Sequence, residues 1–194
     1  MTTETYLLDP ASLAALADVE GQTIGFVGSP SEGFRDSWIS RWNPIVIEVG
    51  GGDLLVSVGA SHSDLESVAM IIPSIEVRWS KSEGKGRPSF PRYPWWRGQA
   101  IDRVLVVRDD YRYEAAGESG YLVVDRGVVL VTETKTIVVA LTDVHDDARL
   151  VLSHEPADPD RIGVITQPAA RDLAWVDLME HSRQLLEIEE AGTR

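Results

Sequence analysis

The sequence predicts a mainly β protein of the α+β class, in which antiparallel strands form one shared sheet, sandwich or barrel. Three observations support this class. Apolar residues alternate at period two from Gln22 to about Leu152, and valine and isoleucine are prominent among them. The links between these runs are short, which favours antiparallel meanders, because a parallel crossover needs a dozen or more residues. The pattern of residues 36–70 also returns at residues 119–153.

A short helix is expected first, over residues 9–19. Asp9 can cap its N-terminus, Pro10 suits the first helical position, and Leu13 and Leu16 supply an apolar side. Gly21 follows at the place where helices commonly end.

The alternating runs then predict strands, at residues 45–49, 54–58, 104–106, 128–131 and 137–141. The glycines of Gly50-Gly51-Gly52-Asp53 predict a tight hairpin between the first two. Residues 133–136 stand at the corresponding place between the last two. A further strand is expected at 162–165.

The sequence predicts a longer helix over residues 168–190. Pro168 would open it, and Leu173, Val176 and Met179 would lie on one side. This apolar side would cover a sheet.

The duplication organises the chain. Its main spacing is 83 residues, and a shorter match of residues 21–24 with residues 98–101 has a spacing of 77. We expect a single domain over residues 1–194, with pseudo-repeat one at 21–77 and pseudo-repeat two at 98–155. A basic, aromatic linker at 78–98 would join them.

Composition narrows the function classes. The chain has no cysteine, so it has no disulfide, thiolate metal site or cysteine nucleophile. The net charge of -13 repels nucleic acid and anionic membranes and favours basic partners. The N-terminus has no basic stretch followed by an apolar core, so we expect a cytoplasmic protein. Arginine outnumbers lysine fifteen to three, as is typical of a GC-rich bacterial genome.

The linker is the first place to expect a ligand. It holds six of the eighteen basic residues and a single acid, and its aromatics are interleaved with arginines. These side chains could stack on a sugar or a nucleotide and place a cation beside an anionic group. The candidate ligand-binding residues are Arg92, Tyr93, Trp95, Trp96 and Arg97. Alternatively, the aromatics plug the core and the arginines pair with the acidic body.

Two other groups of polar residues are candidate sites. His62 and Asp64 recur as His145 and Asp147, and imidazole with carboxylate can bind a metal ion. Because both pairs follow a strand, turn hydrogen bonds are the expected role, and no cofactor or metal is expected. Residues 109–114 are expected to form a solvated hairpin loop.

These patterns favour a non-catalytic acidic interaction protein, such as an inhibitor or immunity-type protein that binds a basic protein partner. One alternative is a sugar or nucleotide binder that uses the linker. Another is a metal-dependent hydrolase built on the two His-Asp pairs. A homodimer formed through exposed strand edges is also open.

Overall fold

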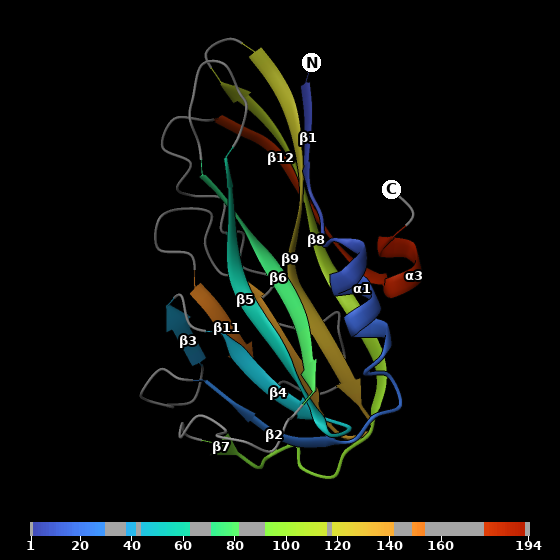
Figure 1. Cartoon of the computed structure of the whole chain (residues 1–194). Helices are drawn as coiled ribbons and strands as arrows, with labels where there is room; N and C mark the ends of the chain where they lie inside the picture. Colours follow the sequence, from blue (N-terminus) through green and yellow to red (C-terminus); the bar gives the residue numbers. More distant parts are fainter. Residues whose placement is uncertain are drawn as a thin grey trace.

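The computed structural model describes residues 2–29, 38–41, 44–62, 71–81, 92–115, 118–141, 149–153 and 177–192. Within these residues the protein is mainly β, with two sheets and few helices (Figure 1). The predicted fold class is confirmed at this level.

The first sheet has the strand order β6-β5-β4-β2-β7, and all its pairings are antiparallel. Its strands are β2 (Ile24–Gly28), β4 (Ile45–Val49), β5 (Gly52–His62), β6 (Ile71–Lys81) and β7 (Arg92–Tyr93). A two-residue turn joins β4 to β5. Its residues Gly50 and Gly51 have φ of 55° and 91°, the backbone that a tight hairpin requires and that glycine adopts without strain. The predicted hairpin is confirmed.

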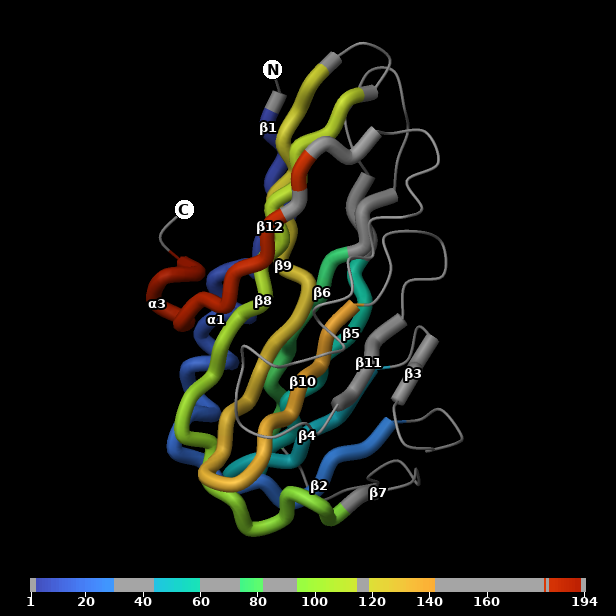
Figure 2. The backbone as a smooth tube through the Cα atoms, turned by 180° about the vertical axis from the view of Figure 1, so that it is seen from behind, coloured from blue at the N-terminus to red at the C-terminus, as the bar shows by residue number. Residues whose placement is uncertain are grey.

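The second sheet has the order β12-β8-β9-β10-β11-β3, and β1 adds to β9 in parallel. Its strands are β1 (Thr2–Tyr6), β3 (Trp38–Arg41), β8 (Ile101–Ala115), β9 (Glu118–Thr132), β10 (Thr136–Leu141), β11 (Arg149–Ser153) and β12 (Asp177–Glu187). One sheet lies in front of the other in Figures 1 and 2, and both sheets are strongly twisted.

Both sheets contribute to one core. The buried apolar residues from the first sheet include Ile24, Val27, Ile45, Ile47, Leu54 and Val56. Those from the second include Val104, Val106, Val128, Leu130, Ile137 and Val139. Two sheets around one core are consistent with the sandwich alternative. The described strands of both sheets form open orders, which does not support a barrel.

The outer face of β8, β9 and β10 is buried as well. A second apolar cluster there holds Leu105, Val107, Val129, Val131, Val138 and Ala140. Because β9 is buried on both faces, residues 128–131 form a continuous apolar run in place of a strict alternation.

The first helix is confirmed as α1 (Pro10–Ala17). The Asp9 side chain caps it by accepting a hydrogen bond from the backbone N–H of Ser12 at 2.7 Å. The Ser12 hydroxyl donates to the carbonyl oxygen of Val77 on β6 at 2.9 Å. This bond fixes α1 beside the edge of the first sheet. A short helix, α3 (Ile188–Ala191), lies next to α1 (Figure 1).

The sequence predicts a helix over residues 168–190, and this is wrong for residues 177–187, which form β12. Leu185 and Leu186 explain the strand. Leu185 packs on the outer cluster, and its neighbour Leu186 packs on the main core. Consecutive side chains therefore point to opposite faces, which is the period of a strand. Residues 168–176 of the predicted helix and the predicted strand at 162–165 lie outside the described residues.

The linker begins inside a strand, because residues 78–81 are the end of β6. Residues 92–93 form β7, which pairs with β2. None of the helices in the described part of the chain is long and apolar enough to cross a membrane.

The two central hairpins share one register. Ile47 pairs with Leu54 across β4 and β5. Leu130 pairs with Ile137 across β9 and β10. Each residue of the second pair lies 83 positions after its counterpart in the first, which is the spacing found in the sequence.

The turns that precede β2 and β8 also match, at the spacing of 77. Gly21 and Gly98 have φ of 73° and 84°. The N–H of Gly21 donates to the carbonyl of Ile101, and the N–H of Gly98 donates to the carbonyl of Ile24. Three more pairs of N–H to carbonyl bonds match at the same spacing. Between the turns, Ile24 donates to Gln99 and Ile101 donates to Gln22. Within each turn the matching bonds are Gln22 to Val19 with Gln99 to Trp96, and Glu20 to Ala17 with Arg97 to Pro94. The two turns therefore contact each other reciprocally.

Candidate functional site

The predicted ligand residues of the linker do not form one surface. Trp96 is 1% exposed and belongs to the main core, which is the alternative that the sequence left open for these aromatics. Trp95 is 48% exposed, and its ring meets that of Trp96 edge to face at 5.7 Å between centroids. Arg97 is exposed on the same turn. Only Trp95 and Arg97 of these three are accessible to a ligand.

Arg92 and Tyr93 are described through their backbone alone. They pair with Gly28 and Val27 of β2. Their proposed contact with a ligand stays a prediction.

The metal hypothesis rests mostly on residues outside the described part of the chain, namely Asp64, His145 and Asp147. His62 is the last residue of β5 and pairs with Ile71. Among the described residues, no group of three histidine or carboxylate side chains could hold a metal ion. The hypothesis gains no support from this geometry.

The expected solvated loop at residues 109–114 is wrong, because these residues lie inside β8. The carboxylate of Asp109 is fully buried. It accepts hydrogen bonds from Nε and Nη2 of Arg183 at 2.5 and 2.6 Å, and Arg183 lies directly opposite it on β12. Arg126 lies 3.9 Å away, on β9. The charge of Asp109 has partners on both neighbouring strands, which is why this carboxylate can be buried.

The phenol of Tyr111 completes this cluster. Its hydroxyl donates to Oδ2 of Asp109 at 2.8 Å. Burial raises the pKa of Tyr111 well above its ordinary value, and the Asp109 carboxylate raises it further, whereas Arg126 and Arg183 oppose this. The phenol therefore stays protonated and acts as a hydrogen-bond donor at neutral pH.

A second buried ion pair occupies the opposite face of β8 and β9. Arg108 and Asp125 are directly paired in register, and both side chains are within 1% of complete burial. Nε and Nη2 of Arg108 donate to the two carboxylate oxygens at 2.7 and 3.1 Å. A β-bulge between Val107 and Arg108 places Arg126 outside this pairing.

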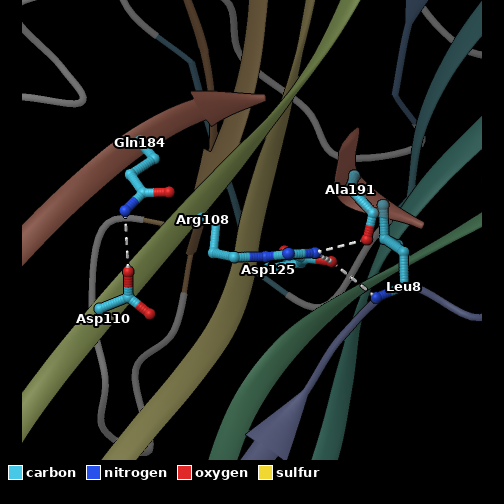
Figure 3. A network of polar contacts seen from close by, with 6 residues as sticks. All are labelled: Leu8, Arg108, Asp110, Asp125, Gln184 and Ala191. Atoms are coloured by element: carbon cyan, nitrogen blue, oxygen red, sulfur yellow. Dashed lines mark hydrogen bonds and ion pairs between the residues drawn. The ribbon is translucent and has the colours of Figure 1, made fainter. Parts of the chain in front are cut away.

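This second pair also holds both ends of the described chain (Figure 3). The N–H of Leu8 donates to Oδ2 of Asp125 at 2.8 Å. Nη2 of Arg108 donates to the carbonyl of Ala191 at 3.0 Å. On the neighbouring strand, Gln184 donates to Asp110 at 3.3 Å. Because Arg108 and Asp125 are shielded from solvent, their arrangement suits holding strands and termini in place and does not suit binding an external ligand.

The candidate binding surface is a groove of about 670 Å³ between α1 and β6, here called the α1–β6 groove. Its lining residues are Asp9, Ala11, Ser12, Ala14, Ala15, Asp18, Glu76, Val77, Arg78 and Trp79. The side of α1 that faces β6 carries three alanines, and these small side chains leave the space open.

Trp79 forms one wall of the groove and is 38% exposed. Its ring lies directly over Gly52 on the neighbouring strand, so closely that a Cβ at Gly52 would overlap Cζ2 of the indole. The absence of a side chain at Gly52 therefore leaves room for the ring. This contact places a large, partly exposed aromatic against β5.

The groove has a negative charge balance. It is lined by three carboxylates, those of Asp9, Asp18 and Glu76, and by one guanidinium, that of Arg78. Arg78 pairs with Glu76 at 3.0 Å in an exposed salt bridge. The last turn of α1 carries no basic residue, so the negative end of the helix dipole adds to the charge of Asp18.

Sequence reasoning missed this groove, although it singled out the aromatics of the linker. The contact that forms it joins Ser12 to Val77, which are 65 residues apart. The linker aromatics, Trp79 among them, are the available sequence signal, but only the pairing of β5 with β6 brings Trp79 to Gly52.

Comparisons of this chain with protein-family models, with curated proteins and with solved structures give no match.

Proposed function

We propose that this protein is a non-catalytic acidic interaction protein that binds a basic protein partner through the α1–β6 groove. Inhibitor and immunity-type proteins, which neutralise a cationic target, have this kind of function. The observation that carries the proposal is the groove itself: an open surface with three carboxylates, one guanidinium and a fixed, exposed indole.

The charge of the whole chain supports the same function. A net charge of -13 speeds encounter with a cationic surface and repels anionic ones. Such long-range attraction brings a partner to the protein but does not orient it. The groove supplies the local shape and the aromatic contact that orientation requires.

The test is a titration with short lysine- and arginine-containing peptides, measured by calorimetry. The groove variant Asp18→Asn/Glu76→Gln should weaken binding about tenfold or more at about 50 mM salt, since screening is still modest there. Asp9 is left unchanged because it caps α1.

The matched control is Asp102→Asn/Glu133→Gln. Both residues are exposed acids outside the groove, so the variant has the same net charge as the groove variant. Binding should stay within about twofold of the wild type. Equal weakening of both variants would reject the groove as the binding site.

A second candidate function is the binding of an anionic planar ligand at the turn of Trp95 and Arg97. The observation that favours it is the 48% exposure of Trp95, together with Nζ of Lys135, which donates to the Trp95 carbonyl at 3.1 Å. Two cations beside an exposed indole suit a nucleotide or an acidic sugar. Trp95→Ala should then abolish the quenching of tryptophan fluorescence by such ligands.

We also propose that the scaffold is a duplicated four-stranded meander packed as a sandwich. In this arrangement β2, β4, β5 and β6 correspond to β8, β9, β10 and β11. The shared register of the two hairpins and the reciprocal bonds of the two glycine turns support it.

A further inference from the structure

We infer that the α1–β6 groove receives an arginine side chain of the partner, whose guanidinium stacks on Trp79 and faces the carboxylate of Asp18. This inference rests on the proposed function and names the chemistry that the same groove would recognise.

The two residues lie toward the same end of the groove. The Ser12 hydroxyl meets Val77, so the first turn of α1 lies beside the middle of β6. The chain after α1 meets the turn next to Gly52, because the N–H of Gly50 donates to the carbonyl of Thr23. The ring of Trp79 lies on Gly52. The C-terminal end of α1, with Asp18, therefore lies toward Trp79.

This end of the groove favours a cation for two independent reasons. The negative end of the helix dipole and the exposed carboxylate of Asp18 act together, and α1 has no basic residue in its last turn to offset them. The indole adds the negative potential of its ring face, and tryptophan is the best aromatic for such contacts.

The fixed ring selects arginine over lysine. A guanidinium is planar, weakly hydrated and able to stack on an indole while it donates to a carboxylate. An ammonium is a compact and strongly hydrated charge, which gains less from a flat surface. Because the ring is packed against Gly52 of β5, a planar cation that stacks on it meets a surface that is already in place.

Backbone geometry indicates how the arginine would be presented. The carbonyl of Val77 points away from β5, off the free edge of the sheet, since β6 is the edge strand and this carbonyl accepts from Ser12 on α1. Backbone groups of an edge strand point off the edge at every second residue, so those of Trp79 point to the same side as those of Val77. An extended partner segment could hydrogen-bond there and set its arginine over the ring.

The experiment compares two short peptides that differ only in having arginine or lysine, titrated calorimetrically at about 50 mM salt. The wild type should bind the arginine peptide roughly three- to fivefold more tightly, the range expected for an exposed cation–π contact. Trp79→Leu keeps an apolar contact with Gly52 but lacks the ring face, so it should bind both peptides equally. Asp18→Asn should weaken both peptides and keep the preference.

Two controls make the result decisive. Trp95→Leu removes the second exposed tryptophan among the described residues and should leave the preference unchanged. If Trp79→Leu is destabilised, Gly52→Ala gives a second route, because its methyl group displaces the ring without removing it. It should also reduce the preference.

The outcomes separate this inference from the proposed function. Equal binding of both peptides by the wild type, with loss of both in the groove variant, would overturn the arginine assignment and leave the basic-partner function standing. No binding of either peptide would overturn both. A preference that persists in both Trp79→Leu and Gly52→Ala would place the arginine elsewhere.

Discussion

Arg108 and Asp125 form an ion pair in which both charges are removed from water. Replacing one partner leaves the other buried and uncompensated. We expect Asp125→Asn to lower the free energy of unfolding by about 3–5 kcal/mol. Urea denaturation followed by circular dichroism measures this loss.

An exposed ion pair provides the comparison for this prediction. Arg103 and Glu187 lie 3.4 Å apart, and each side chain is about half exposed (52% and 45%). Arg103→Gln should cost less than about 1 kcal/mol. If Asp125→Asn costs no more than Arg103→Gln, the buried pair does not hold the fold together.

Tyr111 makes stability depend on pH in the alkaline range. Its pKa is raised in the folded protein, whereas the unfolded chain ionises near pH 10. The folded state thus keeps a proton that the unfolded state loses. The stabilising contribution is full below about pH 10 and is lost as the pH rises further.

Tyr111→Phe tests this contribution. At about pH 8 it should cost roughly 1.5–3 kcal/mol, the worth of a hydrogen bond to the charged carboxylate of Asp109. Between about pH 8 and pH 11 the wild type should lose more stability than the variant, so the difference between them should shrink. Parallel loss in both proteins across this range would contradict the assignment.

At the scale of elements, the turns around Gly21 and Gly98 should respond alike to substitution. Both glycines have positive φ, and neither has an atom within 4 Å of the position that a Cβ would take. Only backbone strain would therefore oppose an alanine. Gly21→Ala and Gly98→Ala should each cost about 1–2 kcal/mol.

The informative result is whether Gly21→Ala and Gly98→Ala lower the free energy of unfolding by the same amount. Equal losses in thermal or urea unfolding are expected if the turns are equivalent parts of a duplicated scaffold. Gly51→Ala gives a reference, since Gly51 also has positive φ and open space but lies in the β4–β5 hairpin. A difference of more than about 1 kcal/mol between Gly21→Ala and Gly98→Ala would count against equivalence.

Several elements could be predicted because their signals are local. The capped helix α1, the hairpin at Gly50 and the alternating strands each depend on neighbouring residues, and the structure confirms them. The fold class follows from these strands and their short links. The spacing of 83 residues between the two central hairpins was also visible, because it depends only on the order of residue types.

Other elements depend on contacts between distant parts of the chain. In β12, apolar residues satisfy a helical spacing, and pairing with β8 decides the strand. Asp109 looked like a loop residue because its partners, Arg126 and Arg183, lie on other strands. The α1–β6 groove arises from a contact across 65 positions, so its acids could not be grouped from sequence.

At the scale of the whole molecule, the net charge of -13 opposes the compact state through self-repulsion. Added salt should therefore stabilise the protein. We expect the thermal midpoint to rise by a few degrees between about 0.01 M and 0.3 M NaCl, as the screening length falls below the molecular dimensions.

KCl at the same concentrations should give the same rise, since screening depends on ionic strength and not on the identity of the cation. A midpoint that falls with salt would show that exposed ion pairs outweigh the repulsion. A rise with only one of the two salts would indicate specific ion binding.

The shared anchoring of Leu8 and Ala191 has a consequence for how the protein opens. The Leu8 N–H and the Ala191 carbonyl are both hydrogen-bonded to the Arg108–Asp125 pair. Detaching either segment therefore removes a hydrogen bond from the same two buried charges. Fraying at one end of the chain is then not independent of the other. Amide protons of residues 7–8 and of residues 188–192 should exchange with solvent as one cooperative unit, although nearly the whole sequence lies between them.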